Sequence, residues 1–170
     1  MRNSSEDENR VTLVGVGNPI RRDDGVGPTV VARMASAGLP PGVGVVEAGT
    51  ARIDLLHVFA ESAGVVLVDA MVRGQAPGTI TRCSPEDLLS APGGFPSLHH
   101  AGLSDILEMA RVAGGRPEVI LIEVEPGDTG WGEGFSDAVE GAINAVIAIA
   151  RDEIGRFLLR PGRIVAAQRF

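Results

Sequence analysis

The sequence predicts a single-domain α/β protein, built as a three-layer α/β/α sandwich around a mostly parallel central sheet. Strand-like and helix-like segments alternate along the chain, an order that builds parallel sheets with helices on both faces. The strongest strand candidates are continuous apolar runs, which are typical of strands covered on both sides. The chain has 170 residues, 44% of them hydrophobic, enough for one core. It contains no internal repeat and no dividing linker.

Five segments have the pattern of strands. VTLVGV at residues 11–16 is a short apolar run rich in β-branched residues, and GVVLVDA at residues 64–70 is the clearest buried strand. EVILIEV at residues 118–124 is the last of them. The strand candidates together are residues 11–16, 43–47, 64–70, 79–82 and 118–124.

Helices are expected between and after these strands. Asp23 and Asp24 stand at the start of the first helix, where carboxylates suit the macrodipole. Thr50 can cap the second helix, and Ser84 followed by Pro85 gives the third a cap and a proline at its first position. The helix candidates are residues 25–37, 50–59, a short helix from residue 85, residues 102–113 and residues 136–159.

We expect residues 1–10 to form a disordered tail, residues 11–160 to form the domain and residues 161–170 to form a C-terminal tail. The first ten residues are polar and lack the apolar region of an export signal. The longest apolar stretch, AINAVIAIA at residues 142–150, is too short to span a bilayer. We therefore expect a cytoplasmic protein without a membrane segment, and the presence of one cysteine agrees with a reducing compartment.

Composition excludes several classes of site. All 15 basic residues are arginines, so a P-loop lysine and a Schiff-base lysine are excluded, and the absence of tyrosine excludes a tyrosine acid. The 22 acidic residues give a net charge of −7, which argues against a nucleic-acid partner. A lone cysteine excludes an internal disulfide and a Cys-rich zinc site. With three histidines, a transition-metal site would need carboxylates.

A glycine-rich loop, GVGNPIRRDDGVG at residues 15–27, follows the first strand. Its first two glycines suggest a dinucleotide-binding turn, but Ile20 replaces the third glycine of that fingerprint. Asp23 and Asp24 also stand where a pyrophosphate needs N–H donors, so nucleotide binding is disfavoured. Either acid alone would be interpreted as a helix cap. Two acids flanked by glycines favour a functional site.

Asp69 ends the most buried strand candidate. A carboxylate at the end of an apolar run is costly unless it has a partner or lies in a solvated cleft. Ligands of open α/β sheets bind at this carboxyl edge. From the position alone, capping of a neighbouring loop explains Asp69 equally well.

Two neighbouring histidines, His99 and His100, precede the helix expected from residue 102. The sequence position does not distinguish which of the pair acts in a site. We expect His57, which lies in the helical pattern LLHVF, to be packed. We expect Cys83 to be a small buried hydrophobic residue and not a nucleophile.

These candidates can be combined, because the loop with Asp24 and the strand end with Asp69 belong to one sheet edge. Two carboxylates and one imidazole form a ligand set suited to a divalent ion such as nickel or zinc. Without a metal, the same groups can perform general acid–base chemistry, with one carboxylate raising the pKa of the other. Neither assignment follows from the residue types alone.

Several segments, in order along the chain, resemble motifs of the hydrogenase maturation endopeptidases, which process the large subunit of nickel–iron hydrogenases. The glycine-rich loop resembles the opening motif of the family, whose second acid, here Asp24, is a metal-binding position. VDAMVRGQAPGT at residues 68–79 resembles the segment with the second acidic ligand, here Asp69. HHAGL at residues 99–103 resembles the segment with the histidine ligand, which aligns with His99.

The resemblance implies an endopeptidase that removes the C-terminal extension of a hydrogenase large-subunit precursor after nickel insertion. Asp24, Asp69 and His99 would contact this nickel, which the substrate supplies and which another divalent ion can replace in the isolated protein. A metal-bound water, a carboxylate-activated water and another group all remain open as the attacking nucleophile. The alternative function is a non-catalytic, nickel-binding assembly factor for the same subunit. A small single-domain protease of this kind could work as a monomer.

The chain departs from the family pattern in places. EAGTARIDLL at residues 47–56 resembles a segment that usually contains Asp-Gly-Gly-Thr, but Glu47 and Ala48 replace the Asp-Gly pair. Arg52 replaces a small residue, and Asp24 is shorter than the Glu of some relatives. These departures bear on substrate preference more than on the fold.

Overall fold

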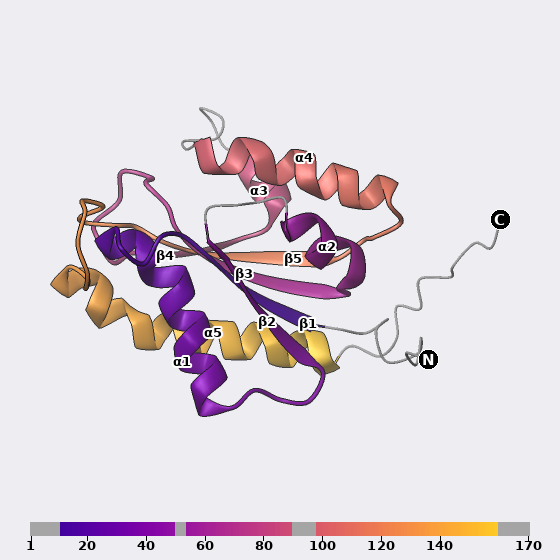
Figure 1. Ribbon diagram of the computed structural model, residues 1–170, viewed down its shortest axis with the longest axis horizontal. Coiled ribbons are helices and arrows are strands. Elements are labelled where there is room, and N and C mark those ends of the chain that lie inside the picture. Colours follow the sequence, from indigo (N-terminus) through magenta and orange to yellow (C-terminus); the bar gives the residue numbers. More distant parts are fainter. Residues whose placement is uncertain (1–10, 50–53, 90–97, 160–170) are drawn as a thin grey trace.

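A five-stranded sheet with the strand order β2-β1-β3-β5-β4 runs through the middle of the molecule (Figure 1). This computed structural model describes residues 11–49, 54–89 and 98–159. Four strands are parallel, and β4 lies antiparallel at the edge beside β5, so the mostly parallel sheet is confirmed. The strands are β1 (Val11–Val16), β2 (Val43–Gly49), β3 (Gly64–Ala70), β4 (Ile80–Cys83) and β5 (Glu118–Val124).

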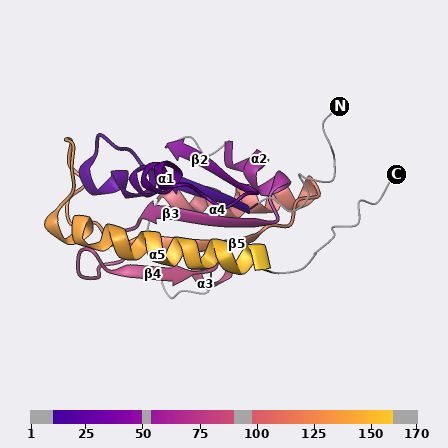
Figure 2. The same ribbon diagram turned by 90° about the horizontal axis from the view of Figure 1, so that it is seen from below.

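Helices cover both faces of the sheet, which confirms the three-layer architecture (Figures 1 and 2). α1 and α5 cover one face, and α2 and α4 cover the other. Residues of β3 alternate between the two cores: Val66 and Val68 face α1 and α5, whereas Val65 and Leu67 face α2 and α4. The helices are α1 (Val26–Ala37), α2 (Asp54–Glu61), α3 (Pro85–Leu89), α4 (Leu98–Val112) and α5 (Asp137–Leu159). Within the described residues, none of these helices combines the length and apolar character needed to cross a bilayer.

The start of α4 differs from the prediction. The helix begins at Leu98 and not at residue 102, so the backbone of His99 lies in its first turn and not in a preceding loop. The prediction took Gly102 as the boundary, but a glycine within a helix costs only about 1 kcal/mol. The backbone of His99 therefore has helical conformation.

Smaller differences concern strand ends and side chains. β2 extends to Gly49 because an irregularity between Gly15 and Val16 allows Val16 to pair with Gly49. His57 is exposed and not packed, because Leu55 and Phe59 form the buried face of α2 and His57 lies away from it. The predicted tails and the predicted cap Thr50 lie outside the described residues.

The cap predicted before α3 is confirmed. The backbone N–H of Ser84 donates to Asp87 Oδ2 over 2.7 Å, and the backbone N–H of Asp87 donates to Ser84 Oγ over 3.2 Å. This reciprocal pair is a capping box. The hydrogen bonds from Ser84 hold the pKa of Asp87 below its ordinary value.

The strand order creates a switch point between β1 and β3. From β1 the chain crosses by α1 to β2, and from β2 it returns past β1 by α2, on the opposite face, to β3. α1, which follows β1, and α2, which leads into β3, lie on opposite faces of the sheet. Ligands of open α/β sheets bind in the crevice at such a point. Gly27, in the first turn of α1, packs so closely that an added Cβ would overlap the carbonyl oxygens of Val16 and Val68. The switch point is thus the expected place for a site.

Candidate functional site

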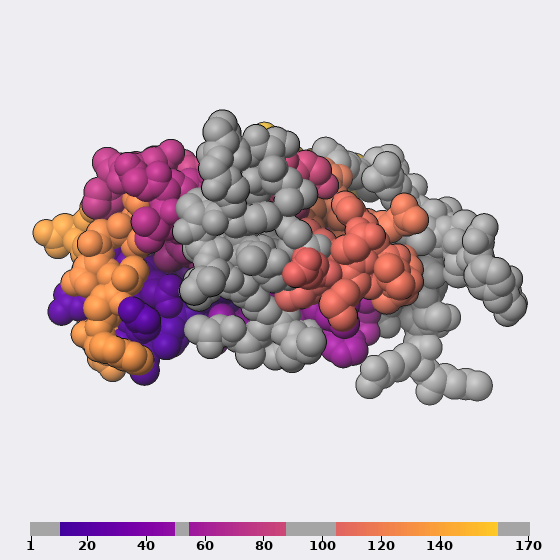
Figure 3. Space-filling model, turned by 90° about the horizontal axis from the view of Figure 1, so that it is seen from above, coloured from indigo at the N-terminus to yellow at the C-terminus, as the bar shows by residue number. Residues whose placement is uncertain are grey.

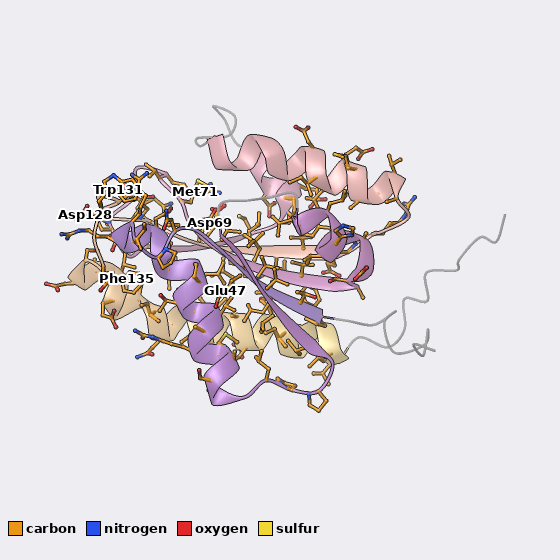
Figure 4. All side chains as sticks on the ribbon, viewed as in Figure 1. Glu47, Asp69, Met71, Asp128, Trp131 and Phe135 are labelled. Carbon is orange, nitrogen blue, oxygen red and sulfur yellow. The ribbon has the colours of Figure 1, made fainter. Side chains whose placement is uncertain are left out.

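Asp24 and Asp69 lie at the switch point. Asp24 belongs to a short 3₁₀ helix, η1 (Arg22–Gly25), that follows the loop after β1, and Asp69 is the second-last residue of β3. β1 and β3 are neighbours in register up to the pair Gly15 and Val68, and η1 contacts β3. Figure 4 shows Asp69 at this end of the sheet. The fold thus brings the loop with Asp24 and the strand end with Asp69 to one edge.

The backbone of His99 lies in the first turn of α4, which covers the sheet face toward which Asp69 is directed. This direction follows from alternation in β3, because Leu67, two residues earlier, packs in the core under α2 and α4. The side chain of His99 is outside the part of the chain that the structure describes. Among the described side chains, no three ligating groups gather into a metal site.

Asp24 is half-buried and oriented by its own loop. Its Oδ2 accepts a 3.0 Å hydrogen bond from the backbone N–H of Asn18, and Asn18 Oδ1 accepts one from the N–H of Ile20 at 3.1 Å. Gly17 adopts a φ of +129°, and an added Cβ there would overlap the carbonyl oxygen of Asp24. Neither acid caps α1, whose N-cap residue is Gly25, with no side-chain hydrogen bond. Within the described residues, Asp24 therefore has one oxygen held by a donor and the other available to a ligand.

Asp23, the neighbouring acid, is a structural anchor. It is 0% exposed. Its Oδ2 accepts hydrogen bonds from the N–H groups of Gly127 and Asp128 at 2.7 and 2.8 Å and from Ser136 Oγ at 2.8 Å. Its Oδ1 accepts one from the N–H of Ser136 at 2.7 Å. Burial alone would raise the pKa of Asp23, but the hydrogen bonds from Ser136, Asp128 and Gly127 outweigh burial and lower it. Asp23 thus joins the loop after β1 to the loop after β5.

Ser136 serves both this anchor and α5. Its Oγ donates to Asp23, and it also accepts a long hydrogen bond of 3.4 Å from the N–H of Val139 in the first turn of the helix. We expect Ser136→Ala to lower the free energy of unfolding by about 1–2 kcal/mol in urea titrations, the usual range for a lost cap and hydroxyl donor. Ser136→Thr retains the hydroxyl and is expected to lose less. Equal losses in both variants would contradict a role for the hydroxyl.

A second buried carboxylate, Glu123, is the in-register neighbour of Asp69 on β5 and is 1% exposed. Arg73 donates to it through Nε at 2.6 Å and forms an ion pair with it through Nη2. Glu125 accepts hydrogen bonds from the N–H groups of Arg73 and Gly74 at 2.7 and 3.1 Å. Sequence reasoning missed Glu123, although the signal that marked Asp69, an acid near the end of an apolar strand, is present there too. Arg73 balances the charge that Glu123 adds beside Asp69.

Cys83 is buried in the core under α2 and α4, as predicted. Burial, together with the negative charge of Glu123, raises the pKa of its thiol to about 12. A thiol of such high pKa is not a nucleophile at neutral pH.

Comparisons with known proteins give a consistent result. The family model described as "Hydrogenase maturation protease" matches residues 28–153. The chain is 32% identical over 149 residues to "Hydrogenase expression/formation protein HupD" of Rhodobacter capsulatus, covering 85% of this chain and 71% of that protein. It is 29% identical over 150 residues to "Hydrogenase 2 maturation protease" of Escherichia coli strain K12, covering 84% and 92%.

A solved structure, that of the hydrogenase maturating endopeptidase HybD from E. coli, has the same fold. The TM-score is 0.78 at 27% sequence identity, and the match covers 86% of this chain and 93% of that one. The match therefore extends over most of both chains.

Proposed function

Because the chain belongs to the hydrogenase maturation protease family, we propose that it removes the C-terminal extension of a nickel–iron hydrogenase large-subunit precursor after nickel insertion. The names of its relatives support a hydrogenase as the substrate. The observation that carries the proposal is the position of Asp24 in η1, beyond the carboxyl end of β1, and of Asp69 at the carboxyl end of the adjacent strand β3, at the switch point of the sheet. We further propose that the reaction takes place in the cytoplasm.

In this proposal Asp24, Asp69 and His99 contact the nickel carried by the precursor. Asp24 contributes the carboxylate oxygen that accepts no hydrogen bond from the described residues. Asp69 supplies a buried carboxylate from β3, and the first turn of α4 carries His99 over the same face of the sheet. Two carboxylate oxygens and an imidazole nitrogen are hard and borderline donors that suit nickel or another divalent ion. Another divalent ion can take the same place when the protein is isolated.

The chemistry is the addition of water across one peptide bond. The C–N bond breaks, the hydroxyl of water remains on the new C-terminus of the large subunit, and a proton goes to the nitrogen of the released extension. The contacts to the nickel fix the position of the precursor relative to the protease. Such fixed geometry converts an encounter into an oriented reaction and lowers the barrier.

A cleavage assay on the precursor tests this function. We expect the protein to release a discrete C-terminal peptide, detected by the mass of the product, from nickel-loaded precursor and not from nickel-free precursor. Precursor incubated alone is the control. Cleavage of both forms would support peptidase activity and would contradict recognition of the substrate by its nickel. An intact extension on loaded precursor would contradict cleavage and support the assembly factor.

A further inference from the structure

Two loops at the carboxyl edge of the sheet are tied into one rigid surface. Arg21 and Gly132 form an isolated parallel β-bridge, in which Gly132 donates to Ile20 and accepts from Arg22, both at 3.0 Å. Nε and Nη2 of Arg21 both donate to the carbonyl oxygen of Thr129, at 3.1 and 2.9 Å. Figure 3 shows the two loops side by side at one end of the molecule, in indigo and orange. The buried side chain of Asp23 joins the same two loops through the four hydrogen bonds described above.

This rigid surface exposes large apolar side chains. Trp131 is 72% exposed and Ile20 is 53% exposed. The guanidinium of Arg21 lies 5.2 Å from the centre of the Trp131 ring, a cation–π contact. We call the side chains of Ile20, Arg21 and Trp131 the Trp131 surface. Contiguous exposed apolar side chains of this kind mark interaction sites on protein surfaces.

The charge of Arg21 is not balanced by a carboxylate among the described residues. Its contacts are the carbonyl oxygen of Thr129 and the ring of Trp131. The neighbouring Arg22, in contrast, pairs with Asp128 at 3.0 Å. Two of the five guanidinium N–H groups of Arg21 donate to Thr129, which leaves three for a ligand. The Trp131 surface therefore combines apolar area with an available cation.

We propose that the Trp131 surface holds the C-terminal extension of the precursor during cleavage, an inference that rests on the proposed function. An apolar side chain of the extension packs on Ile20 and Trp131, and the terminal carboxylate of the extension pairs with Arg21. Figure 4 shows Trp131 at the same end of the sheet as Asp69, so the Trp131 surface lies on the side of the molecule that carries the proposed cleavage site. Tryptophan and arginine are the residue types that most often dominate binding energy at interfaces. The loops are already fixed, so binding orders few additional groups.

The fluorescence of the protein offers a direct test. Trp131 is the only tryptophan and the chain has no tyrosine, so the emission reports this residue alone. The probe is a synthetic peptide with the sequence of the extension, free of tryptophan and tyrosine, with a free carboxylate or an amidated C-terminus. We expect a blue shift of the emission as the free peptide binds, and about tenfold weaker binding of the amidated peptide. Unchanged emission up to millimolar peptide would overturn the proposal.

Kinetics provide the second test, with a matched control. We expect Trp131→Ala to raise KM for nickel-loaded precursor about tenfold with less than a twofold change in kcat, because the contact binds substrate and transition state alike. Val112→Ser changes an 83% exposed apolar residue at the end of α4, next to the amino edge of the sheet, and is expected to change neither constant.

The outcomes separate this inference from the proposed function. Cleavage with equal KM in the Trp131→Ala and Val112→Ser variants overturns the inference and leaves the proposed function standing. No cleavage by the wild type contradicts the proposed function, and the peptide titration then decides the inference alone. An emission that shifts with protein concentration, together with dimers in analytical ultracentrifugation, would assign the Trp131 surface to self-association and overturn the proposal.

Discussion

Asp69→Asn is expected to slow removal of the extension roughly a thousandfold while the protein remains folded. The change removes the negative charge of a residue that is 4% exposed at the carboxyl end of β3. A lost metal contact costs several kcal/mol of transition-state stabilisation, and about 4 kcal/mol corresponds to a thousandfold in rate. Asparagine has nearly the same shape as aspartate, so the strand retains its packing. Single-turnover cleavage of loaded precursor measures the rate, and circular dichroism checks the fold.

Asp24→Asn is expected to give a loss of similar size, because the second carboxylate of the set is removed. The asparagine introduced at position 24 still has a side-chain oxygen that can accept from the backbone N–H of Asn18, so the loop keeps this hydrogen bond. Asp152→Asn, an exposed acid on α5, is the matched control and is expected to leave the rate within twofold. Wild-type cleavage rates in both Asp24→Asn and Asp69→Asn would contradict a role for these two carboxylates in the reaction.

Asp23→Asn is expected to lower the free energy of unfolding by about 3–5 kcal/mol, because hydrogen bonds to a charged group contribute about 1.5–3 kcal/mol each and several of them are lost or weakened. Four donors converge on the carboxylate, and an amide replaces one acceptor oxygen with an N–H₂ group that faces these donors. Urea unfolding followed by circular dichroism measures the loss. Asp24→Asn, one residue further on, is expected to lose less than 1 kcal/mol, because Asp24 accepts one hydrogen bond from the described residues. Similar losses at both positions would contradict the anchor role of Asp23.

The stability of the wild type is expected to depend on pH through the same residue. The folded protein lowers the pKa of Asp23 from the ordinary value of 3.8. The stabilisation is therefore complete well above 3.8 and is lost as the pH falls through the folded pKa. The Asp23→Asn variant has no carboxylate at this position, so this titration does not change its stability. The difference in unfolding free energy between the two proteins should shrink as the pH falls from 5 to about 3, and a constant difference would contradict the lowered pKa.

The sequence predicted the fold well because the strongest signals are local. The continuous apolar runs of β1, β3 and β5 predict buried strands by themselves, and the helices between them predict parallel pairing. Boundaries were less predictable. α4 begins four residues early because residues 98–101 contain no glycine or proline to stop a helix, and β2 is longer because of an irregularity in β1.

The site was predictable only in part, for a physical reason. The positions of Asp24 and Asp69 follow from the ends of parallel strands, which sequence patterns identify. The division of labour between Asp23 and Asp24 does not, because the partners of Asp23 lie 104 to 113 positions away. Likewise, the pairing of Arg73 with Glu123 spans 50 positions. Long-range hydrogen bonds of this kind leave no local pattern in the sequence.

The Asp23 anchor has a consequence for the order of events during synthesis. The carboxylate leaves the ribosome early, but the backbone donors that it needs belong to a segment made more than a hundred residues later. A nascent chain that ends before β5 cannot fix the loop that carries Asp24, and a non-local contact of this separation forms late in folding as well. The Asp23 anchor therefore forms only when nearly the whole domain has emerged from the ribosome.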